Sequence, residues 1–205
     1  MKLYAITDRT LFAGMDALMA QVALWASGGI DYLQIREKDL AATDLAALAS
    51  AIVHAARLSG SRMRVLLNGP SQVAASTGCD GVHLTANLPV SAIADAKASM
   101  SKAVAEPVIS VSCHTLSEIE RARDHGATLA IFAPVFEKRS RTETVPGQGL
   151  HALAEACELA APMPVFALGG VSTENAQDCV NAGAAGIAAI RLFASPHWQT
   201  LQSSR

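Results

Sequence analysis

The stretch Gly183-Ala184-Ala185-Gly186-Ile187 joins the end of one predicted helix to the start of one predicted strand. Its first Gly can adopt the left-handed conformation that ends many helices, and the apolar residues after it begin a strand. The same succession recurs at residues 28–32, 78–82 and 126–129. The leading glycines lie 50, 48 and 57 positions apart, which is about two strand–helix units each time. The chain is therefore predicted to contain four double units of one architecture.

Short β-branched runs alternate with longer Ala- and Leu-rich runs of helical spacing along the whole chain. This alternation predicts eight strands, at residues 2–6, 32–36, 64–68, 81–84, 108–112, 129–132, 165–168 and 186–190. Helices are predicted between them, most clearly at residues 16–27, 43–59, 116–125, 150–160 and 174–182. Weaker helical patterns lie within residues 70–76 and after Pro196.

Eight parallel strands with a helix after each close into a (β/α)8 TIM barrel. The sequence therefore predicts an α/β fold with a single domain that spans residues 1–205, a length at the short limit for this barrel. An open doubly wound sheet shares the alternation and is the alternative, although it does not need eight units.

The composition excludes several classes of protein. A hydrophobic share of 51% with 17% charged residues rules out a disordered chain. The formal net charge is −2 and only 4% of the residues are aromatic. Such a chain has neither the basic surface nor the stacking side chains that nucleic acids require, and it lacks the charge that binds anionic membranes. We therefore expect no nucleic-acid or membrane partner.

The sequence contains four cysteines: Cys79, Cys113, Cys157 and Cys179. Their spacing matches no zinc site and no Cys-x-x-Cys pair, so we expect buried thiols in a reducing cytoplasm. The apolar stretch at residues 3–6 is too short for the core of a signal peptide, and no window approaches the ~20 apolar residues of a membrane span. These observations predict a cytoplasmic protein and leave open whether it forms homo-oligomers.

In a TIM barrel the active site lies at the carboxyl ends of the strands, so the residues that follow each strand indicate its chemistry. Cations predominate there. Arg36 and Lys38 follow the second strand, Arg191 follows the eighth, and Arg141 lies with two more cations in the loop at residues 137–149. This excess of positive charge predicts an anionic ligand. The loop at 137–149 resembles a mobile lid over that ligand, with a floppy surface loop as the alternative.

The loops after the seventh and eighth strands are where such barrels commonly bind phosphate. Gly169 and Gly170 allow backbone N–H groups to approach an oxyanion, and Ser172 is predicted to cap the following helix. Arg191 offers a planar guanidinium that suits phosphate oxygens. We therefore assign Gly169, Gly170, Ile190 and Arg191 to a phosphate site.

Two further features suggest chemistry at the same end of the barrel. Arg36 and Lys38 alternate with Glu37, so on an extended backbone both cations point to one side and can hold a diphosphate. The alternative is a solvated surface turn. His83 is a candidate general acid or base, although a histidine that only packs at the barrel rim explains it equally well.

Six ordered motifs carry a resemblance to a known family: Tyr4-Ala5-Ile6-Thr7-Asp8, Gln34-Ile35-Arg36-Glu37-Lys38, Gly81-Val82-His83-Leu84, Val111-Ser112-Cys113-His114-Thr115, Ala133-Pro134-Val135-Phe136 and Ala167-Leu168-Gly169-Gly170-Val171. Together they resemble the thiamin phosphate synthase/TenI superfamily over residues 3–193. The resemblance implies a barrel that binds thiazole phosphate or thiamin phosphate. It also implies that synthases of the family join a pyrimidine-methyl diphosphate to thiazole phosphate through a pyrimidine carbocation, with Mg²⁺ assisting the loss of pyrophosphate.

The resemblance also implies roles for individual residues. Gln34, Arg36, Lys38 and Asn68 match positions that engage the pyrimidine and its diphosphate. Ser112 matches a hydroxyl on the pyrophosphate side, and Gly170 matches the thiazole phosphate site. Arg141 stands where the family has a lysine, and it keeps the positive charge.

Two departures from the synthase pattern concern the metal. Family synthases follow the third-strand Asn with a Mg²⁺-binding Asp, but here Asn68 is followed by Gly69. The second metal-binding Asp is missing from residues 85–88. The usual Ser after the eighth strand is Arg191, which changes the phosphate pocket. The sequence therefore favours a metal-free site over the Mg²⁺-dependent synthase reaction.

Three functions remain open from the sequence. The favoured one is a TenI-like enzyme that isomerises a thiazole phosphate by proton transfer, with His83, Arg36 and Lys38 as catalytic residues, although Pro134 stands where some TenI proteins place the proton-transferring His. The alternatives are a divergent synthase, which requires Mg²⁺, and a noncatalytic protein that binds thiamin phosphates.

Overall fold

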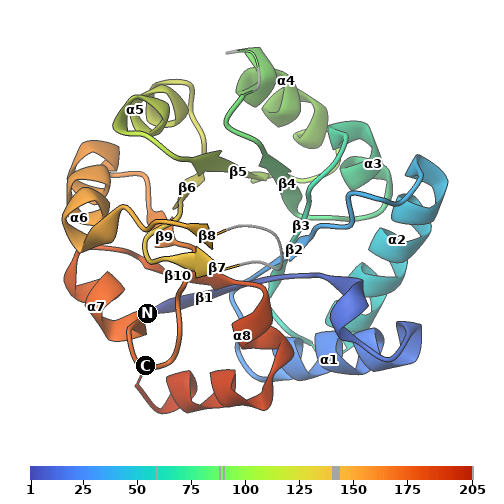
Figure 1. The fold of residues 1–205 in the computed structure, drawn as a ribbon. Helices are drawn as coiled ribbons and strands as arrows, with labels where there is room; N and C mark the ends of the chain where they lie inside the picture. Colours follow the sequence, from blue (N-terminus) through green and yellow to red (C-terminus); the bar gives the residue numbers. More distant parts are fainter. Residues whose placement is uncertain (59, 88, 90, 140–143, 205) are drawn as a thin grey trace.

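The chain folds as a closed barrel of eight parallel strands, in agreement with the predicted (β/α)8 architecture (Figure 1). The structure is a computed structural model and describes residues 1–58, 60–87, 89, 91–139 and 144–204. The barrel strands are β1 (Lys2–Ile6), β2 (Tyr32–Ile35), β3 (Arg64–Leu67), β4 (Gly81–Leu84), β5 (Val108–Cys113), β6 (Leu129–Phe132), β9 (Val165–Ala167) and β10 (Gly186–Ala189). Each begins at the predicted residue and ends within one residue of the predicted end. The doubly wound alternative is wrong because β1 pairs with both β2 and β10.

Helices surround the barrel (Figure 1). They are α1 (Met15–Ser27), α2 (Ala42–Leu58), α3 (Ser71–Ser76), α4 (Ser91–Met100), α5 (Leu116–Asp124), α6 (Gly149–Ala160), α7 (Ala176–Asn181) and α8 (Arg191–Ala194). Short 3₁₀ segments, η1 (Arg9–Leu11) and η2 (Pro196–Ser204), follow β1 and α8. Among the described helices, none combines the length and apolar character that crossing a membrane requires.

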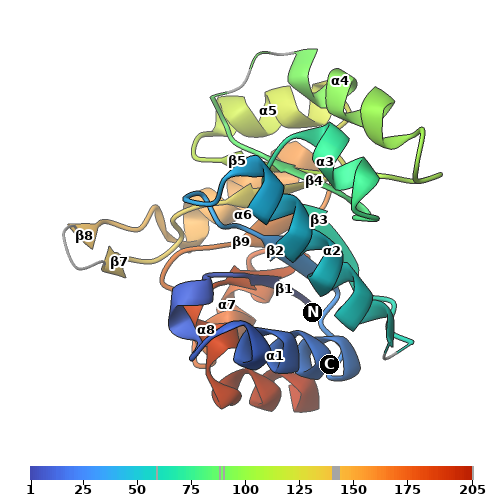
Figure 2. The same cartoon turned by 90° about the vertical axis from the view of Figure 1, so that its right-hand side faces the viewer.

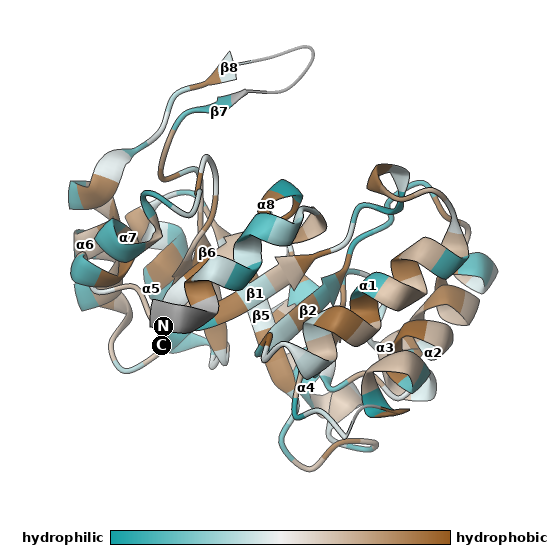
Figure 3. Ribbon diagram, turned by 90° about the horizontal axis from the view of Figure 1, so that it is seen from below, coloured by the Kyte–Doolittle hydropathy of each residue, from teal (hydrophilic) through white to brown (hydrophobic). Residues whose placement is uncertain are grey.

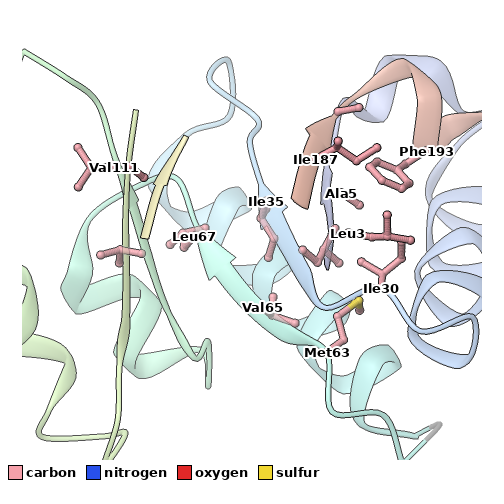
Figure 4. Packing of buried hydrophobic residues seen from close by; sticks show 14 of the residues in the cluster. Leu3, Ala5, Ile30, Ile35, Met63, Val65, Leu67, Val111, Ile187 and Phe193 are labelled. Carbon is pink, nitrogen blue, oxygen red and sulfur yellow. The ribbon is translucent and has the colours of Figure 1, made fainter. Parts of the chain in front are cut away.

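Alternate residues along each strand pack on opposite sides of the sheet, because successive strand side chains point to opposite faces. One buried cluster lies between the strands and the helices, where Leu3, Ala5 and Ile187 lie beside Phe193 of α8 (Figure 4). A second cluster fills the barrel itself. It comprises Tyr4, Ile6, Leu66, Val108, Leu129, Ile131, Phe166 and Ala188. The barrel is therefore a packed core whose chemistry must lie at its ends.

A hairpin that the sequence patterns did not predict leaves the barrel after β6. It consists of β7 (Lys138–Arg139) and β8 (Thr144–Val145), with Lys138 opposite Val145. Figure 2 shows that it projects past the carboxyl ends of the barrel strands, and Figure 3 shows it standing apart from the body of the protein. The hairpin therefore marks the end of the barrel where an active site is expected.

The four thiols are free, as predicted. Cys79, Cys113 and Cys179 are buried, and Cys157 is partly buried. Burial raises the pKa of Cys79 to about 11, so this thiol stays protonated at neutral pH.

Candidate active site

The residues that face the inside of the barrel near its carboxyl end form the candidate site. Gln34 pairs in register with Ile6 and Leu66, two residues of the cluster that fills the barrel. Gln34 therefore points inward. The same alternation places His83 of β4 and Ser112 of β5 on the inner face, since His83 pairs with Ser110. The register thus brings side chains from three strands to one mouth.

Gln34 lies at the floor of this mouth. Its side chain is only 1% exposed, and its Nε2 atom has no hydrogen-bond partner among the described residues. A buried amide N–H without a partner costs free energy, so a ligand that accepts this hydrogen bond is favoured. Asn68 directly follows β3, and its N–H donates to the carbonyl of Ile35 at the end of β2 at 2.9 Å. Both side chains therefore belong to the strand ends at the mouth.

The Arg36-Glu37-Lys38 segment is fixed by contacts with the end of β1. The Thr7 hydroxyl donates to the buried Glu37 carboxylate at 2.6 Å and accepts a bond from the Arg36 N–H at 2.9 Å. The Arg9 N–H and guanidinium also donate to Glu37, at 3.0 and 3.2 Å. Glu37 is therefore engaged by β1 and the residues after it. Among the described residues, the partners found for the Glu37 carboxylate are Thr7 and Arg9, and neither flanking cation is one of them.

His83 lies between two serines of β5. Its Nδ1 is 2.8 Å from the Ser110 hydroxyl and its Nε2 is 2.8 Å from the Ser112 hydroxyl. Burial lowers the pKa of His83 to about 3, and the charges of Arg36 and Lys38 contribute to the shift. The ring is therefore neutral at pH 7 and both nitrogens are occupied. This environment fits the packing interpretation of His83 better than the role of general acid.

The loop after β9 presents backbone N–H groups at the mouth. Gly169 and Gly170 have φ angles of 97° and 64°, which L residues with side chains rarely adopt. A Cβ on Gly170 would approach the Glu137 carbonyl oxygen to 2.6 Å and Phe136 Cβ to 2.7 Å. Within the described part of the chain, no acceptor contacts the N–H groups of Gly169 and Gly170. These N–H groups are therefore available to donate to an oxyanion, and the phosphate site at Gly169 and Gly170 stays a prediction.

The residues that follow β10 lie next to the glycine loop, because β10 pairs in parallel with β9. Ile190 is the N-cap of α8, and its side chain packs against the cluster inside the barrel. Arg191 occupies the first turn of α8 and is exposed. A short helix at this position, with its first N–H groups unpaired inside the helix, is the usual phosphate-binding element of TIM barrels.

The predicted cap at Ser172 is wrong. The helix begins at Ala176, and Asn175 occupies the N-cap position. The Asn175 side chain instead accepts from the Ser172 N–H at 2.8 Å and donates to the Gly170 carbonyl at 3.1 Å. These bonds hold residues 170–175 in a turn, so the helix starts later than residue 174. The same side chain supports the glycine loop.

The hairpin is anchored at its base beside the glycine loop. The N–H groups of Val135 and Phe136 each donate at 2.9 Å, to the carbonyls of Leu168 and Gly169. On the returning side, the Gln148 side chain donates to the Ala133 carbonyl at 2.9 Å. Arg141, a predicted substrate-binding residue, lies outside the described residues.

The described polar side chains near the mouth do not form a metal site. Among the described residues, no three His, Cys, Asp or Glu side chains cluster in a way that could hold a metal ion. Two carboxylates follow β2. Glu37 is buried and accepts hydrogen bonds from Thr7 and Arg9. Asp39 forms an ion pair of 2.6 Å with Arg9. The ends of β3 and β4 carry Asn68-Gly69 and residues 85–87, which contain no carboxylate.

Sequence reasoning missed three residues of this site: Tyr4, Glu37 as a buried brace, and Ser110. Tyr4 and Ser110 lie inside the barrel with 0% exposure, and the Tyr4 hydroxyl donates to Ser110. The alternation of Ser110 and Ser112 is visible in the sequence. The contact of these serines with His83 cannot be read from the sequence, because only the strand register brings His83 opposite them.

Comparisons with known proteins agree with this architecture. Residues 3–193 match the sequence model of a family described as thiamine monophosphate synthase. The chain is 33% identical over 189 residues to a thiamine-phosphate synthase of Roseiflexus sp. (strain RS-1), which covers 91% of this chain and 75% of that protein. It is 34% identical over 192 residues to a thiamine-phosphate synthase of Methanoculleus marisnigri, and the match covers 92% of this chain and 85% of that protein. A solved structure of a thiamine phosphate pyrophosphorylase from Pyrococcus furiosus superimposes with a TM-score of 0.77 at 25% identity, covering 98% and 91% of the two chains.

Proposed function

The chain belongs to the thiamine monophosphate synthase family, and from this premise we propose that it joins a pyrimidine-methyl diphosphate to thiazole phosphate. The names of its relatives support this synthase reaction over the TenI-type isomerisation that the sequence patterns favour. The two substrates are small phosphorylated heterocycles, so the site must bind a diphosphate and a phosphate at once.

One observation carries the proposal: a single mouth has two separate sets of groups suited to anions. Arg36 and Lys38 follow β2, and their charges reach the buried His83. Gly169 and Gly170 follow β9, with N–H groups that find no acceptor among the described residues. The strand order places β1 and β10 between these two sets, so they lie apart on the rim. The cations suit a diphosphate, and the glycine loop with Arg191 suits the phosphate of the second substrate.

The reaction breaks the bond between the pyrimidine methylene carbon and the diphosphate oxygen, and its electron pair leaves with pyrophosphate. The thiazole nitrogen then donates its lone pair to the methylene carbon, which forms the new carbon–nitrogen bond. Fixed cations that neutralise the leaving pyrophosphate stabilise this transition state. In this chain Arg36 and Lys38 perform that role. Gln34 and Asn68 orient the pyrimidine, and Gln34 brings an unpartnered donor to it.

The Mg²⁺ that synthases of the family use does not fit the residues present. Mg²⁺ prefers carboxylate oxygens in an octahedral arrangement. The ends of β3 and β4 present Asn68, Gly69 and residues 85–87, and none of these is acidic. The described residues contain no alternative cluster. The proposed reaction therefore relies on the side-chain cations named above.

The missing carboxylates also support a second candidate, the TenI-type isomerisation of a thiazole phosphate, which needs no diphosphate chemistry. This candidate requires a group that carries a proton. His83 is a weak choice because its pKa is lowered to about 3 and both its nitrogens contact serines. A buried neutral ring of this kind holds a hydrogen-bond network more readily than it donates a proton.

The two candidates are separated by their products. The purified protein is incubated with the pyrimidine-methyl diphosphate, with thiazole phosphate, and with both, and pyrophosphate is measured by a coupled enzyme assay. A separate incubation contains the thiazole carboxylate tautomer alone, and its conversion to the aromatic isomer is followed by chromatography. Pyrophosphate that depends on both substrates supports the synthase. Turnover of the thiazole carboxylate tautomer alone supports the isomerase. Binding of thiazole phosphate without either turnover supports a noncatalytic binder and contradicts the proposal.

A further inference from the structure

Four polar side chains form a continuous line from the middle of the barrel to its mouth. The Tyr4 hydroxyl is 3.3 Å from the Ser110 hydroxyl, which is 2.8 Å from His83 Nδ1. On the other side of the ring, His83 Nε2 is 2.8 Å from the Ser112 hydroxyl. Tyr4 and Ser110 are 0% exposed and His83 is 6% exposed, whereas Ser112 is only partly buried. The line therefore has a closed inner end and an open outer end.

The inner end sets the direction of these hydrogen bonds. Among the described residues, Ser110 is the one hydrogen-bond partner of the Tyr4 hydroxyl, so the phenol proton must go to Ser110. Ser110 has a single hydroxyl proton and two acceptor lone pairs. If His83 Nδ1 also donated to Ser110, the buried Ser110 proton would have no acceptor among the described residues, which costs free energy, so the favoured arrangement is donation from Ser110 to His83 Nδ1. An imidazole that accepts at Nδ1 carries its proton at Nε2 when it is neutral. His83 therefore donates to Ser112, and the Ser112 hydroxyl keeps its own proton for another acceptor.

We propose that Tyr4 and Ser110 are positioning residues that hold His83 in its Nε2–H form, so that Ser112 presents its hydroxyl proton to an oxyanion at the mouth. In the reverse arrangement, Ser112 would donate to His83 and would offer the mouth only lone pairs, which repel an oxyanion. The identity of that oxyanion as the diphosphate of a substrate rests on the proposed function. The direction of the hydrogen bonds is independent of the proposed function.

The surroundings keep each member of the line in the required protonation state. Tyr4 is stacked on Tyr32 with ring centroids 5.7 Å apart and contacts the edge of Phe166, which fixes its hydroxyl. Burial raises the pKa of Tyr4 above its usual range, so it remains a donor. The charged groups that act on His83 are Arg36 and Lys38, and both disfavour an imidazolium. The same arrangement therefore persists across the neutral pH range.

The first test measures the tautomer in the ligand-free protein. Nitrogen-15 NMR of histidine-labelled protein distinguishes a protonated from an unprotonated ring nitrogen, and the His83 signals are identified by their absence from a His83→Gln variant. We expect the protonated nitrogen to be Nε2. A protonated Nδ1 overturns the proposal, whatever reaction the protein catalyses. This measurement uses the wild-type chain, so it does not depend on whether a variant folds.

The second test uses Tyr4→Phe, with Tyr32→Phe as its matched control. Tyr32 is in the same aromatic group, and no hydrogen bond from its hydroxyl to the line is found among the described residues. In Tyr4→Phe the Ser110 proton is free to turn, so we expect signals of both His83 tautomers. We expect Tyr32→Phe to keep the Nε2–H form alone. A Tyr4→Phe protein that melts like the wild type and keeps a single tautomer contradicts the role of Tyr4.

The third test measures the affinity for inorganic pyrophosphate by titration calorimetry. We expect a loss of about three- to tenfold in Tyr4→Phe, since the oriented donor is then present only part of the time. We expect the affinity for pyrophosphate to fall about tenfold or more in Ser112→Ala and to stay unchanged in Tyr32→Phe. Equal affinities in Tyr4→Phe and the wild type overturn the proposed effect on Ser112. A wild-type protein that holds the Nε2–H form but binds no pyrophosphate contradicts the proposed function and leaves the tautomer assignment intact.

Discussion

The buried neutral His83 makes the stability of this protein depend on pH in a way that can be calculated. In the unfolded chain a histidine titrates near pH 6.5, whereas burial beside Arg36 and Lys38 lowers the pKa of folded His83 to about 3. Between these two values the unfolded chain binds more protons than the folded protein. The stability contributed by this residue is therefore present above about pH 6.5 and is lost as the pH falls.

The magnitude follows from the unfolded pKa, because folded His83 stays neutral throughout the range tested. At pH 7 the unfolded histidine is mostly neutral, and at pH 5 it is almost fully protonated. Lowering the pH from 7 to 5 therefore reduces the free energy of unfolding by about 2 kcal/mol through this residue. His83→Gln removes this contribution because glutamine does not titrate, although the substitution itself shifts stability at every pH.

The assay is urea unfolding followed by circular dichroism at pH 7 and pH 5, for the wild type and His83→Gln. The other titrating groups are common to both proteins and cancel in the comparison. We expect the wild type to lose about 2 kcal/mol more than the variant between the two pH values. An equal loss in both proteins would mean that His83 titrates normally in the folded state, which would refute the account of its environment.

Three other substitutions test the binding site. Gly170→Ala should cost about 1–3 kcal/mol of stability and abolish thiazole phosphate binding by calorimetry, because φ is 64° and the new Cβ would meet Phe136 at 2.7 Å. Arg191→Ala should weaken thiazole phosphate binding about tenfold, through the loss of a charged hydrogen bond. Gly69→Asp should make pyrophosphate release respond to Mg²⁺, because it adds a carboxylate directly after Asn68, although its Cβ would lie only 3.2 Å from Leu45, whose side chain must shift.

Each of these substitutions has a control. Gly126→Ala introduces a Cβ at a φ of 80° where nothing lies within 4 Å, so it should lose stability without affecting phosphate binding. Arg191→Lys should restore part of the lost affinity, because the charge remains. Gly69→Asn matches the size of Asp without its charge and should show no response to Mg²⁺. Equal behaviour of a variant and its control would contradict the corresponding role.

The barrel could be predicted because its signal is local and repeated. A helix-ending glycine followed by a β-branched run recurs along the chain, and that pattern depends on neighbouring residues alone. The β7–β8 hairpin could not be predicted in this way, since strands of two residues have no measurable period. The helix after β9 starts later than predicted because the Asn175 side chain bonds to the backbone of Ser172 and Gly170. Such side-chain bonds compete with helix formation, and helix propensities do not show which of the two will form.

The site was predictable to the extent that strand ends meet at one rim. That rule predicted Asn68, His83 and Ser112 at one rim from the chain alone, whereas Gln34 was assigned only through the family resemblance. It could not show that Glu37 is bound by residues of β1, or that Ser110 and Tyr4 complete a line behind His83. Those contacts depend on which strands are neighbours and in which register. A sequence does not state the register, because a shift of one residue exchanges the two faces of a strand.

The proposed synthase reaction requires that one mouth hold both phosphorylated substrates and join them. The most direct measurement is pyrophosphate release by the wild-type protein with the pyrimidine-methyl diphosphate and thiazole phosphate together, in the presence of a chelator. We expect pyrophosphate release that requires both substrates, persists without Mg²⁺ and falls strongly in Arg36→Ala. Release that disappears with the chelator, or that is unchanged in Arg36→Ala, would contradict it.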